Sequence, residues 1–197
     1  MGDQVESDIL LSEMAGGILR LTLNDQKRRN ALSETMLAQL SDAFAKAALD
    51  PSVRVIVLAG NGPAFCAGHD LKEITAARSG EDNGKAYFKA LFDTCASLMQ
   101  LIVRNPKPVI AEVATVATAA GCQLVASCDL AMAADSALFA TPGVNIGLFC
   151  STPMVALSRN VSNKHAMEML LTGDMVSAEK AQQIGLINQC FSAEALT

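Results

Sequence analysis

Hydrophobic and polar positions along this chain follow a two-residue period in some stretches and a helical period in others. Residues 18–23 place Leu19, Leu21 and Leu23 on one face, which is typical of a strand. Residues 53–59 are a β-branched run with almost no polar break, which indicates a strand buried on both faces of a parallel sheet. Further strands are expected at residues 109–113, 129–134 and 186–191.

Apolar residues at helical spacing lie between these strands. They predict a helix over residues 33–49, capped by Ser33, and a long amphipathic helix over residues 88–102. Shorter helices are expected at residues 153–160, 164–171 and 178–184. Because strands alternate with helices, we expect a single α/β domain over residues 1–197, with residues 1–14 as a loose N-terminal lead-in.

The composition narrows the possible partners. Of the 197 residues, 51% are hydrophobic and 18% are charged, which excludes global disorder. A net charge of −5 is a poor match to a phosphate backbone, so no nucleic-acid partner is expected. No apolar run approaches the roughly 18 residues of a membrane span, so no membrane partner is expected either. The acidic start resembles neither a secretory signal nor an Arg-rich transit peptide, which predicts a cytoplasmic location.

The cysteines and histidines give no metal-binding pattern. None of the six cysteines pairs with another as C-x-x-C, and only two histidines are present, so no metal is expected. Most of the cysteines lie in apolar stretches, as Cys128 does. Buried, reduced thiols are therefore expected.

Two loops of small residues, at 65–72 and 119–123, follow predicted buried strands. Small side chains let a ligand approach the backbone closely, and free N–H groups at the start of a helix can hold a negative oxygen. The ends of parallel strands are where α/β folds bind ligands. From spacing alone, tight strand-to-helix turns explain these loops equally well.

The motifs that contain these loops resemble the crotonase family, the enoyl-CoA hydratase/isomerase superfamily. The matching segments occur in the family's order and cover nearly the whole chain, at residues 23–32, 64–73, 108–129, 139–147 and 172–186. The resemblance implies a β-β-α spiral fold, an acyl-CoA substrate with CoA as part of it and no other cofactor, and a homo-oligomer, either trimer or hexamer. It also implies an oxyanion hole made by the backbone N–H groups of His69 and Ala120, which would stabilise the developing enolate oxygen.

The resemblance further implies where the substrate binds. The basic residues Lys27 and Arg28 match the loop that contacts the CoA phosphates, although such a run is also typical of a solvated turn. The full set of implied substrate contacts is Lys27, Arg28, Ala67, His69, Asp70, Leu71, Lys72 and Ala120.

The chain departs from the family at the two glutamates of its hydratases. Gln123 and Gly143 stand at these positions, and neither side chain can transfer a proton near neutral pH. The imidazole of His69 is an alternative proton carrier. The C-terminal helical block of the family is also missing from the sequence. The chain is thus expected to be a hydratase/isomerase-class enzyme with weak or altered activity, or alternatively a non-catalytic acyl-CoA-binding protein.

Overall fold

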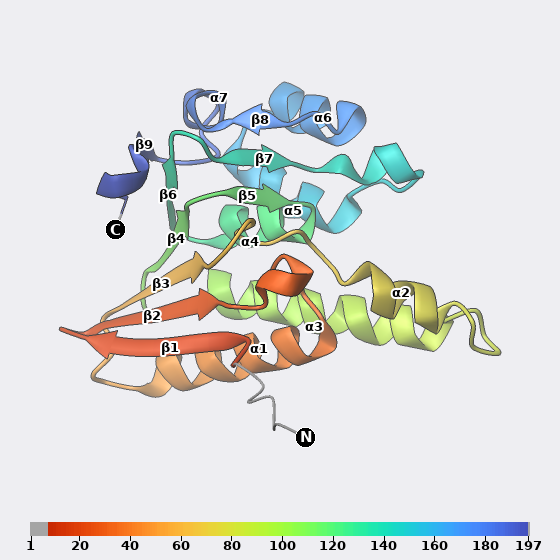
Figure 1. Cartoon of the computed structure of the whole chain (residues 1–197), viewed down its shortest axis with the longest axis horizontal. Coiled ribbons are helices and arrows are strands. Elements are labelled where there is room, and N and C mark those ends of the chain that lie inside the picture. The colour runs from red at the N-terminus through yellow and green to blue at the C-terminus, as the bar shows by residue number, and fades with distance from the viewer. Residues whose placement is uncertain (1–7, 197) are drawn as a thin grey trace, which may run out of the picture.

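The computed structural model describes residues 8–196, and its main element is a six-stranded sheet with the order β1-β2-β3-β4-β6-β9 (Figure 1). The strands are β1 (Leu10–Ala15), β2 (Ile18–Leu23), β3 (Val55–Gly60), β4 (Val109–Val113), β6 (Leu130–Ala134) and β9 (Gln189–Phe191). Only β1 runs antiparallel to its neighbour; the other pairings are parallel. The predicted α/β class with a largely parallel sheet is therefore confirmed.

The expected lead-in at residues 1–14 is wrong for the part that the structure describes. Residues 10–15 form β1, which pairs with β2 over its whole length. The turn between them is Gly16-Gly17, with φ of 57° and 86°, the positive values that a two-residue hairpin turn requires. This Gly-Gly pair was the available signal for the hairpin. Residues 1–7 lie outside the described residues.

A second, three-stranded sheet was not predicted. It has the order β5-β7-β8, with strands β5 (Val116–Thr118), β7 (Leu138–Ala140) and β8 (Val176–Ser177). These strands are only two or three residues long, too short to establish a period of two in the sequence. Figure 1 shows them stacked above β1–β3, with α4 following β5.

Helices cover both parts of the fold. They are α1 (Glu34–Leu49), α2 (Leu71–Ala77), α3 (Lys85–Val103), α4 (Ala120–Ser127), α5 (Ser151–Asn160), α6 (Asn163–Thr172) and α7 (Ala178–Gln183), with short 3-10 turns η1 (Gln26–Arg28), η2 (Pro142–Ile146) and η3 (Ala193–Ala195). The predicted cap of α1 is present, since Ser33 Oγ accepts a hydrogen bond from Met36 N at 3.2 Å. In Figure 1, α1 and α3 lie side by side below β1–β3, and the two helices contact each other.

The core between these layers is aliphatic with a few phenylalanines. Phe44, Phe65 and Phe139 are among the largest fully buried side chains. All six cysteines are free; four are buried as expected, and Cys150 and Cys190 are half-buried. By length and composition alone, α3 is apolar enough to cross a membrane, although the sequence analysis expected no such segment. The buried residues of α3 belong to the hydrophobic core cluster, so this helix packs as part of the fold.

Candidate active site

The first wall of the candidate site is residues 66–70, which we call arm one. It is held from both sides by backbone hydrogen bonds. Leu32 N donates to Gly68 O at 2.8 Å, and Thr118 N donates to Cys66 O at 2.9 Å. Gly68 has a φ of 96°, and a Cβ there would lie 2.9 Å from the Cβ of Ala119, so glycine is needed both for conformation and for space. The close approach brings arm one directly against the start of α4.

The second wall is residues 119–123, which we call arm two. Ala119 has φ 51° and ψ −120°, a conformation that residues with a Cβ rarely adopt and that stores on the order of 1–3 kcal/mol of strain. Its N–H donates to Ala140 O at 2.9 Å, which anchors the turn to β7. Gly121 faces arm one so closely that a Cβ would meet Cys66 O at 2.1 Å. Ala119, the strained residue, turns the chain at the end of β5, so that the next N–H group, that of Ala120, points away from this strand.

The two arms present the expected pair of backbone donors. Within residues 8–196, neither the N–H of His69 nor that of Ala120 donates a hydrogen bond to another residue. A Cβ on Gly68 would lie 3.4 Å from Ala120 N, which places the residue before His69 beside the second donor. Ala120 is 2% exposed. Unpaired buried N–H groups are uncommon and costly, so this pair suits a ligand that carries a negative oxygen.

The imidazole of His69 packs edge-on against Phe92, with ring centroids 5.6 Å apart and planes at 87°. Neither ring nitrogen has a hydrogen-bond partner in the described part of the chain. Burial lowers the pKa of His69. A lowered pKa keeps the ring neutral near pH 7, so it adds no positive charge beside the two donors.

Gln123 and Gly143, which the resemblance placed at the family's glutamate positions, have very different surroundings. Gln123 is 6% exposed, and its side-chain oxygen has no partner among the described residues. Gly143 lies in η2, where an added Cβ would meet Leu148 O at 2.7 Å and Cys150 Sγ at 2.8 Å. A side chain at residue 143 is therefore blocked by the 148–150 segment. No carboxylate occupies either position.

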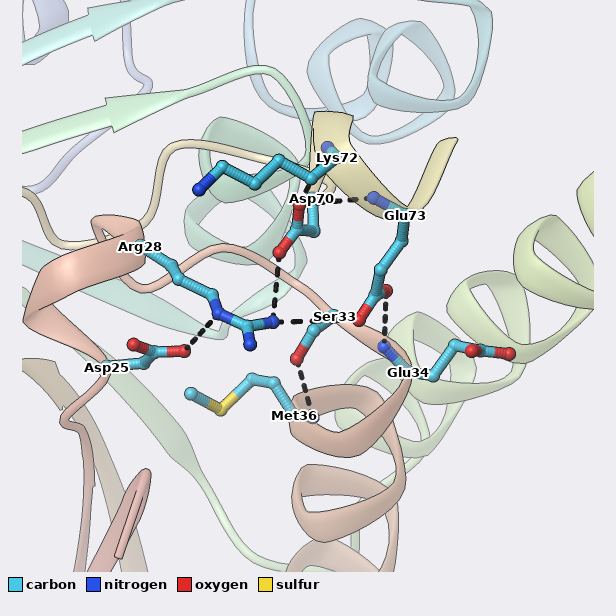
Figure 2. A network of polar contacts seen from close by, with 8 residues as sticks. All are labelled: Asp25, Arg28, Ser33, Glu34, Met36, Asp70, Lys72 and Glu73. Carbon is cyan, nitrogen blue, oxygen red and sulfur yellow. Dashed lines mark hydrogen bonds and ion pairs between the residues drawn. The ribbon is translucent and has the colours of Figure 1, made fainter. Parts of the chain in front are cut away.

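Arg28 is the centre of a polar network that the sequence did not reveal (Figure 2). Its guanidinium contacts three carboxylates: Asp70 at 3.1 Å, Asp25 at 3.6 Å and Glu73 at 3.7 Å. Asp70 in turn caps α2, because its Oδ1 accepts from Lys72 N at 2.8 Å. Arg28 thus joins η1 to the residue that directly follows His69.

The other basic residues expected at the substrate are free of this network. Within the described chain, the ammonium groups of Lys27 and Lys72 form no ion pair with a carboxylate, and both residues are exposed. Leu71 is 59% exposed at the start of α2. Ala67 lies in arm one, where its N–H donates to Arg29 O at 3.1 Å. The structure therefore brings the predicted substrate contacts together around arm one and the N-terminal end of α2.

The chain is similar to known proteins over nearly its whole length. The family model described as enoyl-CoA hydratase/isomerase matches residues 13–197. The chain is 50% identical over 190 residues to enoyl-CoA hydratase domain-containing protein 3, mitochondrial, of Danio rerio, covering 96% of this chain and 64% of that protein. It is 35% identical over 178 residues to 2,3-dehydroadipyl-CoA hydratase of Escherichia coli (strain K12), covering 90% and 67%.

Two solved structures show the same fold. The enoyl-CoA hydratase structure from Mycobacterium smegmatis has a TM-score of 0.91 at 53% identity and covers 96% of this chain and 72% of that chain. Human enoyl-CoA hydratase domain-containing protein 3 has a TM-score of 0.89 at 44% identity, covering 96% and 73%. The crotonase-like fold expected from the motifs is confirmed.

The relatives also correct one expectation. Those from fish, rat and human are named as mitochondrial proteins, which contradicts the cytoplasmic location predicted from the acidic start of the chain. The chain spans about 64% of the length of the Danio rerio relative. With the family model matching nearly the whole chain and the fold shared with solved relatives, the chain belongs to the enoyl-CoA hydratase/isomerase family.

Proposed function

We propose that this chain binds an acyl-CoA thioester with the thioester oxygen between the backbone N–H groups of His69 and Ala120. The observation that carries the proposal is the pair of unpaired donors that the two arms bring together. Such preorganised donors stabilise the oxygen most strongly when it gains enolate character, and removing one typically slows catalysis by about 10²–10³. The arms are fixed before any ligand binds, so little reorganisation is needed.

The adjacent acid and base positions favour weak or altered chemistry over classical hydration. The amide of Gln123 can orient a water molecule but cannot accept its proton. Gly143 offers no side chain, and its surroundings leave no room for one. Isomerisation of a double bond needs a carboxylate near residue 143 in the same way. The thioester can be polarised, but neither residue 123 nor residue 143 supplies a side chain that could move protons efficiently.

The CoA part of the substrate would lie on the outer side of arm one. Lys27 and Lys72 are exposed there, and their ammonium groups have no carboxylate partner within residues 8–196, which suits phosphate. Arg28 is assigned a positioning role, because three carboxylates already surround it. No cofactor is required beyond the CoA of the substrate.

We also propose that the chain forms a homo-oligomer, trimer or hexamer, as its family does. Exposed apolar side chains cluster in sequence at the end of η2 and just after it, where Ile146 is 63% exposed, Leu148 52% and Phe149 42%. An apolar group of this kind favours association in water. Sedimentation velocity of the purified chain tests this proposal, and a single monomeric species would contradict it.

A second candidate function is non-catalytic acyl-CoA binding, and Gln123 together with Gly143 favours it. Measuring both binding and turnover of crotonyl-CoA separates the enzyme from the non-catalytic binding protein.

Titration with crotonyl-CoA and with its thioether analogue, which lacks the carbonyl, tests the oxyanion hole without changing the protein. We expect tighter binding of the thioester and a lowered carbonyl stretching frequency in infrared difference spectra. Equal affinities and an unshifted carbonyl band would contradict the proposed site, whereas a shifted band without any product identifies a binding protein.

A further inference from the structure

A groove of about 400 Å³ opens between α3, α4 and α5, beyond Gln123. Its walls are largely apolar, and its lining includes Met99, Arg104, Gln123, Ala126, Val155 and Arg159. Gln123, Ala126 and Ser127 stand on one face of α4, at the spacing of successive helical turns. The groove therefore follows the same helix whose first residue is Ala120.

The buried amide of Gln123 points to a ligand in this groove. It lines the groove while being 94% buried, and its Oε1 has no hydrogen-bond partner in residues 8–196. Leaving a buried polar atom unpaired costs about 1–3 kcal/mol, which a bound polar group or water would recover. Gln123 is three residues after Ala120, a rise of about 4.5 Å along the helix. Gln123 thus belongs both to arm two and to the lining of the groove, so an acyl chain that runs along α4 from Ala120 would reach the groove at this residue.

The charges of the groove indicate which ligand it suits. Its lining contains two arginines and no aspartate or glutamate, in a protein whose net charge is −5. Among the described residues, neither Arg104 nor Arg159 forms an ion pair; one guanidinium nitrogen of Arg159 donates to Val155 O at 2.6 Å. Two uncompensated guanidinium groups beside an apolar wall suit a ligand with an apolar stem and an anionic end.

We propose that the groove selects ω-carboxyacyl-CoA thioesters, whose acyl chain lies along the apolar wall and whose terminal carboxylate reaches Arg104 and Arg159. The inference rests on the proposed function, since it takes the thioester to lie at His69 and Ala120. From Ala120 to Ser127 the helix rises about 10 Å, which favours dicarboxylic chains of medium length. The CoA phosphates are excluded as the anion because they belong on the opposite, arm-one side of the thioester.

Matched thioesters test the terminal carboxylate by itself. Suberyl-CoA and octanoyl-CoA have the same number of acyl carbons and the same CoA, and differ only at the chain end. We expect the unaltered chain to bind suberyl-CoA about tenfold more tightly, as for a hydrogen-bonded charged group. In R104Q, R159Q and the double variant, this preference should fall to within about twofold, with octanoyl-CoA affinity unchanged. Isothermal titration gives both dissociation constants.

The exposed Lys164 on α6 supplies the control, because K164Q removes the same charge outside the groove and should keep the preference. Equal binding of the two thioesters by the unaltered chain would overturn the inference while leaving the proposed function intact. Failure of both thioesters to bind would instead contradict the proposed function and with it the inference. If R104Q and R159Q dissociate an oligomer in sedimentation velocity and do not alter the preference, the groove is an interface between copies, and the inference is wrong.

Discussion

The two arms of the candidate oxyanion hole hold equivalent N–H groups by different physical means. Arm one, residues 66–70, is tied at its far end by the charged network of Arg28, whose side chain is 51% exposed. Arm two, residues 119–123, contains no charged residue and is held by close packing and a strained turn at Ala119. One donor therefore lies on an arm held by backbone hydrogen bonds and by a partly exposed ion-pair network, and the other lies on an arm held by steric fit in the core. The two arms should respond differently to mutation, salt and pH.

The largest effect is expected where the arms touch. In Gly121→Ala the new Cβ would lie 2.1 Å from the carbonyl oxygen of Cys66, and backbone on both sides prevents relief. We expect a loss of about 3 kcal/mol or more in the free energy of unfolding, at the upper end of overpacking effects. Urea denaturation followed by circular dichroism measures it.

Gly147→Ala is the matched control for this substitution. Its Cβ would meet nothing within 4 Å, although its φ of 76° disfavours alanine, so a loss of only about 1 kcal/mol is expected. If Gly121→Ala proves as stable as the unaltered protein, the arms are not held by packing, and the contrast between them disappears.

A smaller effect of opposite sign is expected at the strained turn. Ala119→Gly removes a Cβ from a backbone conformation that favours glycine, which relieves about 1–3 kcal/mol of strain. Glycine also raises the conformational entropy of the unfolded state, which lowers the free energy of unfolding by roughly 0.5–1 kcal/mol. A gain of about 1 kcal/mol in unfolding free energy should appear in urea denaturation. A loss would mean that contacts of the Ala119 Cβ, including that with Gly68, outweigh the strain.

The sequence predicted the two arms unequally well for physical reasons. The small residues at 65–72 and 119–123 indicated two tight strand-to-helix turns, and the resemblance of their motifs to the family implied backbone donors at His69 and Ala120. The strain at Ala119 and the contact between Gly121 and Cys66 arise only when residues more than 50 positions apart meet. The basic run of Lys27, Arg28 and Arg29 likewise matched the family's phosphate-contacting loop. Only the fold shows that the guanidinium of Arg28 forms an ion pair with Asp70, 42 positions away in the sequence.

Arg28 provides the next prediction, on arm one. Because its guanidinium is half exposed, solvent screens its ion pairs, and Arg28→Gln should lower the unfolding free energy by no more than about 1 kcal/mol. A double-mutant cycle with Asp70→Asn should give a coupling energy of about 0.5–1 kcal/mol that shrinks in 1 M salt.

The control is the surface ion pair of Lys46 with Asp42, whose side chains are 75% and 61% exposed. This pair should show almost no coupling. A coupling at Arg28 that does not depend on salt would contradict electrostatic positioning of arm one.

The smallest effect concerns the pH dependence that His69 gives to arm one. Burial lowers the pKa of His69 in the folded protein relative to its ordinary value of 6.5, so the unfolded state binds a proton more readily. The stabilisation is therefore complete above pH 6.5 and decreases as the pH falls toward the lowered value. In His69→Gln this contribution is absent, and the unfolding free energy should decline less steeply below pH 6.5. One proton limits the difference in slope to about 1.4 kcal/mol per pH unit.

His165→Gln on α6, beside Glu168, serves as the control for removing a histidine elsewhere. Parallel curves for His69→Gln and the unaltered protein between pH 7 and 5 would show that burial of this ring does not govern its titration.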